Sequence, residues 1–435
     1  MILIYSKHIT NRLTYTLNVV FKHLLKVDYR LVSLEEFSTS SQTTKINYSP
    51  LKIENCISIY PHKLLFEKDI NDHKIEIEWI NKKPYFFKTS KNNRFKYDLF
   101  AAIFYMVSRY EEYHATNLDF HNRFEAEQSL AFKNDFLEIP VVNLWALEIK
   151  DSILKNNSSY EFPKTNYRYL NTFDIDIAYA YKGKSSIRLI SSAIKSLVTL
   201  NIKELKNRFA YWLKINKDPY DTYDLIEKEQ KKHPTENYYF FLLGDYGKYD
   251  KNLAHTSNTY KKLIQRISQK NKVGIHPSYQ SNDNPKKLKT EIKRLQNIIA
   301  ETITHSRQHF LKLSLPNTYE QLISSGIKHD FSMGFASKIG FRAGICSPYP
   351  FFNIAKDLEY DLMITPFQIM DGTLNHYLKL NPKEAIEKIK TIVLEVKNVN
   401  GTFVSLWHNS SLEESFEWKN WTPVYKTLVE MAKGK

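Results

Sequence analysis

The chain has 435 residues, 42% of them hydrophobic, and 62 Lys and Arg against 47 Asp and Glu give it a formal net charge of +15. This length favours two domains over one, and the hydrophobic content excludes a disordered chain. The 2 cysteines, Cys56 and Cys346, exclude a disulfide framework and a cysteine zinc site, which is typical of a reducing compartment.

The first residues do not read as a secretory signal. Lys7, Arg12 and Lys22 interrupt their apolar run, and no small-residue cleavage site follows. No stretch of the sequence approaches the roughly 18 uninterrupted apolar residues of a membrane span. The sequence therefore predicts a cytoplasmic protein, with the inner face of the membrane as a second, peripheral location.

Residues 1–165 are predicted to form a smaller α+β domain. Aromatic and apolar runs at 75–80 and 84–87 are typical of two strands joined by a turn. Apolar residues recur at helical spacing between 99 and 107, and a second helix is predicted at 144–154. No catalytic constellation stands out, and the role of this segment stays open. Three charges in it either have a function or form a charged helix end, and we favour the helix end: Arg109, Glu111 and Glu112.

From residue 166 to 435 the pattern changes to strands that alternate with helices. Short apolar runs predict strands at 169–173, 238–243, 273–275, 310–313, 340–342, 363–365 and 403–406. Such alternation implies parallel pairing and an α/β fold class. In barrels of this architecture the carboxyl ends of the strands form the active face. Reactive side chains stand at these ends: Asp174, His276, Arg342 and His408.

A basic insertion interrupts this alternation at about 182–235. Its first part, 182–217, holds nine Lys or Arg residues against the single acid Glu204, and its apolar residues recur at roughly helical spacing. We therefore expect basic amphipathic helices. They either dock on an anionic membrane surface, or pack against the domain, for instance as a lid over the site. We favour the packed arrangement.

Asp174 and Asp176 come two residues apart at the end of a predicted strand. A regular strand places both carboxylates on the same side. Two like charges so close resist joint ionisation unless a cation lies beside them. The pair therefore suits one metal ligand and one general base, although a helix cap or a loop would also accept two aspartates.

Further segments add side chains of the same chemistry. His276 directly follows a strand, and His309 precedes another; imidazole is the commonest neutral ligand of zinc. Arg342 stands between two glycines, where a guanidinium can hold a carboxylate or bind a substrate oxygen. Asp371 begins an Asp-Gly pair, and His408 ends a strand. A lone histidine is more often structural, so the case depends on these residues together.

The order of these motifs resembles the polysaccharide deacetylases, the NodB-homology enzymes of carbohydrate esterase family 4. The motifs are TFDxD, a strand followed by His-x-Ser, GFRA, an Asp-Gly pair and a strand ending in Leu-x-His, over about residues 168–412. The resemblance implies a deformed (β/α) barrel of NodB-homology type and a hydrolase that removes N-acetyl groups from a carbohydrate. It also implies a divalent metal, zinc in our prediction.

The resemblance assigns catalytic roles to four of these residues. Asp174 would be the general base, and Arg342 would hold its carboxylate. Asp371 would be the acidic residue of the fourth motif, and His408 would donate a proton to the departing amine. An imidazolium suits that task. We place the Tyr279 amide where it could stabilise a developing oxyanion.

The metal site departs from the family in one position. Asp176 and His276 match metal ligands, but Gln280 stands where the family places a second histidine. Catalytic zinc usually has three protein ligands. Either His309 replaces the missing ligand, or the metal is lost and the chain is a catalytically inactive glycan-binding or scaffold protein. We favour His309, because the base, acid and arginine candidates are all retained.

Compartment and charge narrow the expected partners. A cytoplasmic deacetylase would meet a nucleotide-sugar or a lipid-linked sugar as its N-acetylated substrate, and both carry phosphates that suit the net charge of +15. Peripheral membrane contact through 182–217 would fit the lipid-linked case. No nucleic-acid-binding motif is recognisable, so nucleic acid is not an expected partner.

Overall fold

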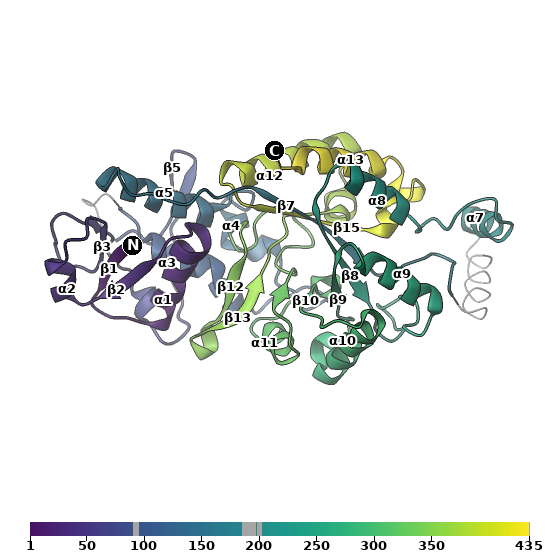
Figure 1. Ribbon diagram of the computed structural model, residues 1–435, viewed down its shortest axis with the longest axis horizontal. Helices are drawn as coiled ribbons and strands as arrows, with labels where there is room; N and C mark the ends of the chain where they lie inside the picture. Colours follow the sequence, from purple (N-terminus) through teal and green to yellow (C-terminus); the bar gives the residue numbers. More distant parts are fainter. Residues whose placement is uncertain (90–94, 185–196, 198–201, 435) are drawn as a thin grey trace.

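The structure is a computed structural model, which describes residues 1–89, 95–184, 197 and 202–434. Its fold is mixed α/β; the described residues form a four-stranded sheet, a nine-stranded sheet and the two-stranded pair of β5 with β6, and the two larger sheets lie in different parts of the molecule (Figure 1). Of the insertion predicted at 182–217, residues 185–196 and 198–201 lie outside the described residues, so the helices predicted there are not described. None of the described helices is long and apolar enough to cross a membrane.

The N-terminal segment contains a four-stranded parallel sheet in the order β2-β1-β3-β4, which we did not predict. All five residues of its central strand are buried, and a short continuous apolar run cannot be told from a helix by its periodicity. The predicted strands near 75–87 and both predicted helices are present. The elements are β1 (Ile2–Ser6), α1 (Asn11–Leu17), β2 (Tyr29–Val32), α2 (Leu34–Thr39), β3 (Lys45–Tyr48), β4 (Ile57–Ser58), β5 (Glu78–Ile80), β6 (Lys83–Tyr85), α3 (Leu99–Val107), α4 (Leu130–Lys133) and α5 (Val141–Asn156).

The rest of the chain alternates between strands and helices, as predicted. Its elements are β7 (Arg168–Ile175), α7 (Ile202–Trp212), α8 (Tyr223–Lys232), β8 (Glu236–Leu242), α9 (Asn258–Ser268), β9 (Lys272–His276), α10 (Pro285–Ile299), β10 (His305–Ser306), α11 (Asn317–Ser324), β11 (His329–Asp330), β12 (Tyr349–Asn353), β13 (Leu358–Ile364), β14 (Ile369–Met370), α12 (Pro382–Asn398), β15 (Thr402–His408) and α13 (Trp421–Ala432).

Two strand predictions are wrong. Residues 310–313 do not form a strand, because Phe310 and Leu311 have left-handed backbone angles, with φ of 59° and 53°. Residues 340–342 form a turn instead, in which Gly340 has a φ of 119°. The other predicted strands correspond to β7, β8, β9, β13 and β15.

The nine strands described in this half form one sheet, in the order β12-β13-β11-β10-β9-β8-β7-β15-β14. Every pairing is parallel except that of β12 with β13. A separate apolar cluster joins Phe331, which follows β11, with Met370 of β14, so the sheet curves around it. Within the described residues β12 and β14 are nevertheless free edges. This half is α/β as predicted. Its described strands form no closed sheet, so the deformed (β/α) barrel that the resemblance implied stays a prediction.

The N-terminal segment and the larger sheet share one continuous hydrophobic core. The ring of Tyr15 in α1 lies 4.8 Å from that of Phe352 in β12, and the Tyr15 hydroxyl donates to the carbonyl of Pro350 at 2.9 Å. The predicted division of the chain at residue 165 therefore stays a prediction, since the two halves pack together along this contact.

Candidate active site

Five strands of the larger sheet, within the run from β10 to β14, bring the candidate residues to one edge. The carboxyl ends of parallel strands meet at the same edge of a sheet, where α/β proteins place their ligands. β7 ends beside Asp174, and Asp176 follows it; β9 ends at His276. His408 ends β15 and is paired in register with Asp174, and Asp371 directly follows β14. His309 lies three residues beyond β10.

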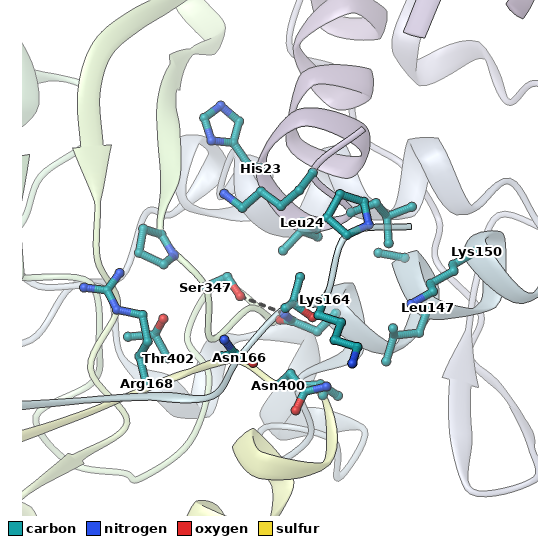
Figure 2. Close-up of a pocket in the computed structure, with 18 of the residues that line it drawn as sticks. His23, Leu24, Leu147, Lys150, Lys164, Asn166, Arg168, Ser347, Asn400 and Thr402 are labelled. Carbon is teal, nitrogen blue, oxygen red and sulfur yellow. Dashed lines mark hydrogen bonds between the residues drawn. The ribbon is translucent and has the colours of Figure 1, made fainter. Parts of the chain in front are cut away.

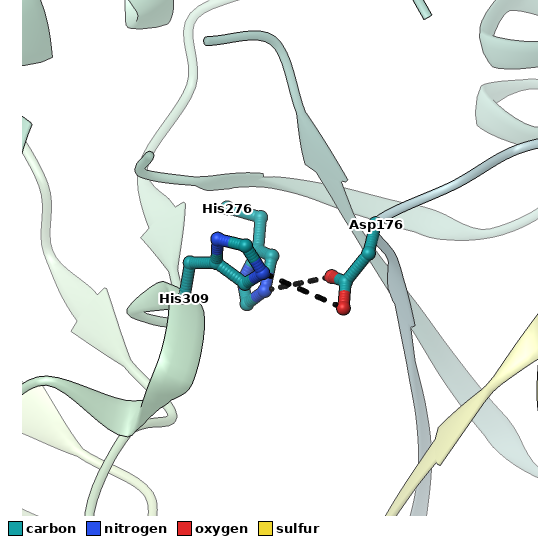
Figure 3. A group of neighbouring side chains, drawn as sticks. All are labelled: Asp176, His276 and His309. Carbon is teal, nitrogen blue, oxygen red and sulfur yellow. Dashed lines mark ion pairs between the residues drawn. The ribbon is translucent and has the colours of Figure 1, made fainter. Parts of the chain in front are cut away.

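Asp176, His276 and His309, our three predicted ligands, form a group of the size that can hold a metal ion. Their nearest ligand atoms all lie within 4.8 Å of one another. Nε2 of His276 is 3.1 Å from Asp176 Oδ1, and Nε2 of His309 is 3.5 Å from Asp176 Oδ2. Both rings point their Nε2 atoms toward the Asp176 carboxylate (Figure 3).

The hydrogen bonds around the two rings favour a cation between them. His276 Nδ1 lies 2.6 Å from the carbonyl of Arg307, and His309 Nδ1 lies 2.9 Å from the carboxylate of Asp250. Both partners can only accept, so each Nδ1 carries a proton, and in the neutral form of each ring Nε2 turns its lone pair toward Asp176. Asp176 Oδ1 is buried and accepts no hydrogen bond from the described residues. Orienting partners of this kind are typical of metal-ligating histidines.

Protonation of the rings is the alternative to a cation, and the pKa shifts show how strongly the site favours positive charge. Burial raises the pKa of Asp176, but His309, His276 and His408 outweigh it and hold that pKa well below its usual value. Burial lowers the pKa of His309, but Asp176 and Asp250 raise it to about 9. Either a proton or a metal ion therefore satisfies this group of acceptors.

Asp174 lies beside this group and is held by an arginine that we did not assign. Nη1 of Arg307 donates to Asp174 Oδ1 at 2.9 Å, and both side chains are almost fully buried. Asp174 Oδ2 is 3.8 Å from His276 Nε2, so the carboxylate adjoins the candidate metal position. The Arg307 guanidinium packs against the ring of Phe240 and donates through Nε to the carbonyl of Phe331.

His408 and Asp371 form a second pair on the same pocket. His408 Nδ1 is 2.9 Å from Asp371 Oδ1, and the His408 amide donates to Asp371 Oδ2 at 2.7 Å. Nε2 of His408 is 3.7 Å from Asp176. Burial lowers the pKa of His408, but Asp371 above all, with Asp176 and Asp174, raises it to about 10. The ring therefore carries a proton at neutral pH.

Arg342 is not at this site, which corrects our assignment. Its guanidinium makes two hydrogen bonds to Glu112, at 2.6 and 2.9 Å, and donates to the carbonyl of Gly334 at 3.1 Å. Glu112 also accepts from Arg109, which is buried, so the charged helix end that we predicted includes an ion pair that joins the two halves of the chain. Arg307 occupies the place beside Asp174 that the resemblance gave to Arg342.

Two further features differ from our predictions. The Tyr279 amide donates to Asp250 Oδ1 at 2.9 Å, so it is not directed at a developing oxyanion. Asp250, which we did not single out, thereby links this amide to the ring of His309. The signal for Arg307 was present in the sequence, because Arg307 and His309 are two residues apart in SRQHF at a strand end.

A pocket of about 360 Å³ is lined by five of the candidate residues: Asp174, Asp176, His276, His309 and His408. Its wall contains aromatic rings, Tyr220, Phe310, Tyr377 and Trp418, which come from loops beyond the strand ends. Arg123 of the N-terminal segment also lines it. The pocket is therefore built from both halves of the chain, although the catalytic candidates all come from the larger sheet.

A second pocket, of about 390 Å³, lies at the amino ends of β7 and β15 (Figure 2). Arg168, which begins β7, and Thr402, which begins β15, line it together with Lys150 and Lys164. No Asp or Glu is among its lining residues. It contains no pairing of a base with a metal-ligating group, so it is not the candidate active site.

Residues 2–158 match a family of unknown function (DUF7033), a segment that includes Glu112 and Arg123 but none of the candidate catalytic residues. No curated protein matches the chain. Solved structures with a similar chain path include a protein from Mycobacterium smegmatis assigned to the polysaccharide deacetylases, with 12% identity, coverage of 62% of this chain and 85% of that one, and a TM-score of 0.40.

Two others are a polysaccharide deacetylase from Bacillus cereus and a CE4 family pseudoenzyme from Bacillus anthracis. The first has 12% identity, covers 61% of this chain and 88% of its own, and has a TM-score of 0.28. The second has 10% identity, covers 62% of each chain and has a TM-score of 0.25.

Proposed function

We propose that this chain is a metal-dependent hydrolase that removes N-acetyl groups from a sugar or glycan precursor. One observation carries the proposal. Two histidine lone pairs and a carboxylate converge beside Asp174, itself held by Arg307, and beside the protonated His408. A base, an acid and a set of metal ligands on one pocket are the parts that amide hydrolysis requires.

Asp176, His276 and His309 would hold the metal. One carboxylate and two imidazoles are a common ligand set of catalytic zinc, which leaves a coordination position open. A divalent ion there would polarise the acetamide carbonyl and make water more acidic. The orphaned Asp176 Oδ1 and the two Nε2 lone pairs fit such an ion.

The chain's own residues would move the protons. Asp174 takes a proton from the water that adds to the acetamide carbonyl carbon, and Arg307 keeps its carboxylate oriented. When the C–N bond breaks, His408 gives its Nε2 proton to the departing amine nitrogen, while Asp371 holds the ring by Nδ1. The products are acetate and a free amine, and Asp174 returns its proton to His408 through solvent.

The carbohydrate part of the proposal is supported by the order of the sequence motifs and by the aromatic wall of the pocket, since sugar rings pack on aromatic faces. A nucleotide-sugar or a lipid-linked sugar stays our proposed substrate. We also propose that the protein is cytoplasmic and contacts the inner membrane face through 182–217, of which residues 182–184, 197 and 202–217 are described. Four large apolar side chains are exposed there: Phe209, Trp212, Leu213 and Ile215.

Metal content and acetate release test the proposal together. The purified protein is expected to hold about one zinc and to release acetate from UDP-N-acetylglucosamine or from N-acetylglucosamine oligomers. Asp176→Ala and His276→Ala should lose the metal, because each removes one of three ligands. Asp174→Asn should keep the metal and lose about 10²–10⁴-fold in rate.

The outcomes separate the alternatives. A protein with no bound metal that releases no acetate from any of these compounds contradicts the proposal. Metal-independent binding of the same oligomers that survives Asp174→Asn, without acetate release, would instead establish the inactive glycan-binding protein.

A further inference from the structure

The loop that carries His309 has an unusual backbone. Phe310 and Leu311 follow it directly and both have positive φ, at 59° and 53°. Such angles are uncommon for large L-residues and persist only where the surrounding structure holds them. At functional sites they often fix a neighbouring side chain.

Two residues of the N-terminal segment hold this loop from outside. Arg123 Nη1 donates to the carbonyl of Phe310 at 2.7 Å. Asp119 orients that guanidinium: its Oδ2 accepts from Arg123 Nε at 2.7 Å and lies 2.7 Å from Nη2. The Asp119 Oδ1 atom accepts the amides of His121 and Arg123, at 2.9 and 2.8 Å, so the carboxylate is itself fixed.

Aromatic packing holds the same loop by its side chain. The ring of His121 lies 4.8 Å from that of Phe310, which also contacts Tyr279 and Tyr249 at 5.4 and 5.5 Å. His121 Nδ1 lies 3.2 Å from the Tyr279 hydroxyl. Residues 119–123 therefore contact Phe310 at both its carbonyl oxygen and its ring.

We propose that Asp119 and Arg123 are positioning residues for the metal centre, so that the N-terminal segment completes the site. The inference rests on the proposed function, because it requires that His309 ligates a metal. Asp250 fixes the His309 ring at Nδ1, and Arg123 fixes the backbone one residue further on. Loss of either contact lets the Nε2 atom of His309 move away from Asp176. Partners of this kind typically contribute 10–100-fold to metal affinity.

The test compares zinc affinity in Arg123→Met with that in Arg30→Met. Arg30 pairs with Glu36 at the surface of the same segment, so its variant controls for the loss of an arginine ion pair. Arg123→Met is expected to bind zinc 10–100-fold more weakly in competition with a chromophoric chelator, with the Tm of the metal-free protein within a few degrees of the parent. Arg30→Met should bind zinc like the parent protein.

Two further readouts distinguish positioning from general stability. The visible absorption of the Co²⁺-substituted protein should change in Arg123→Met and not in Arg30→Met, because it reports the arrangement of the ligands. If Arg123→Met does not fold, Asp119→Asn retains the guanidinium but loosens it, and should weaken zinc binding in the same direction.

Each outcome has a distinct meaning. Equal zinc affinity and equal Co²⁺ spectra in the parent protein, Arg123→Met and Asp119→Asn overturn the positioning role and leave the proposed function intact. A parent protein that binds no zinc and no Co²⁺ overturns the proposed function first, and this inference with it.

Discussion

At the scale of single residues, two buried arginines take different tasks. At the candidate site Arg307 donates to Asp174. Arg342 instead donates to Glu112, which also accepts a hydrogen bond from Arg109. Burial raises the pKa of Glu112, but Arg342 and Arg109 lower it more, so this carboxyl is charged. The GFRA motif thus serves packing between the two halves of the chain, and the arginine that matters for the base lies in SRQHF.

Because the two arginines bind different carboxylates, we expect different effects when each is replaced by methionine. Arg342→Met should lower the free energy of unfolding by about 3 kcal/mol, because it breaks a buried ion pair, while the folded protein binds zinc like the parent. Arg307→Met should lower the rate of acetate release by about 10²-fold or more, because Asp174 loses the group that orients it. Urea denaturation and acetate assays on both variants check this. A catalytic loss confined to Arg342→Met would restore the assignment from the resemblance.

At the scale of elements, strand ends and loops divide the site between them. β7, β9 and β15 place their polar residues by register, since each strand is paired along its whole length. β10 has only two residues, and the loop beyond it places His309 through left-handed angles. Helix α7 lies at the end of the molecule opposite the N-terminal sheet, where it and residues 213–217 carry exposed apolar side chains (Figure 1).

The exposed side of this helix predicts binding to anionic membranes. Trp212 and Leu213 are 43% and 69% exposed, and Lys214 and Lys217 follow them at the surface. Apolar insertion and attraction of lysine to anionic lipid act together at such a surface. The protein should therefore co-sediment with phosphatidylglycerol vesicles, and Trp212→Glu with Leu213→Glu should weaken this by about 10-fold or more. Phosphatidylcholine vesicles are the control; equal sedimentation of parent and variant would exclude this contact.

At the scale of the whole molecule, the N-terminal segment and the larger sheet are packed as one body. Gly340 shows how closely they approach, since a Cβ there would lie 2.4 Å from the carbonyl oxygen of Leu137. The Phe341 amide donates to that same carbonyl at 2.8 Å, and the Val142 amide donates to Gly344 at 2.9 Å. Together with the shared core, these contacts couple the stability of the two halves.

We therefore expect one cooperative unfolding transition for the whole chain. Calorimetry of the metal-free protein should show a single peak. Separation of the halves would expose core residues and break the buried ion pair between Glu112 and Arg342. Arg342→Met should shift this one peak to lower temperature. Two resolved peaks, of which Arg342→Met moves only one, would show that residues 1–165 and 166–435 are independent domains.

The sequence alone determined which chemistry the larger half carries. Alternation of apolar strands with helices predicted parallel pairing, and parallel pairing brings the residues at strand ends together. Asp174, Asp176, His276 and His408 follow from that rule, because strand ends are local features of a sequence. His309 was predicted as a metal ligand because Gln280 stands where the family places a second histidine. It does lie beside the other two candidate ligands.

Only the tertiary structure decided how those residues are held. Whether a sheet closes depends on the sum of its twist and on its edges, which no local pattern reports. Which arginine reaches Asp174 depends on contacts between residues more than 130 positions apart. The link from Arg123 to the loop of His309 spans both halves of the chain in the same way. Local periodicity predicts elements and their ends, whereas long-range packing decides which side chains meet.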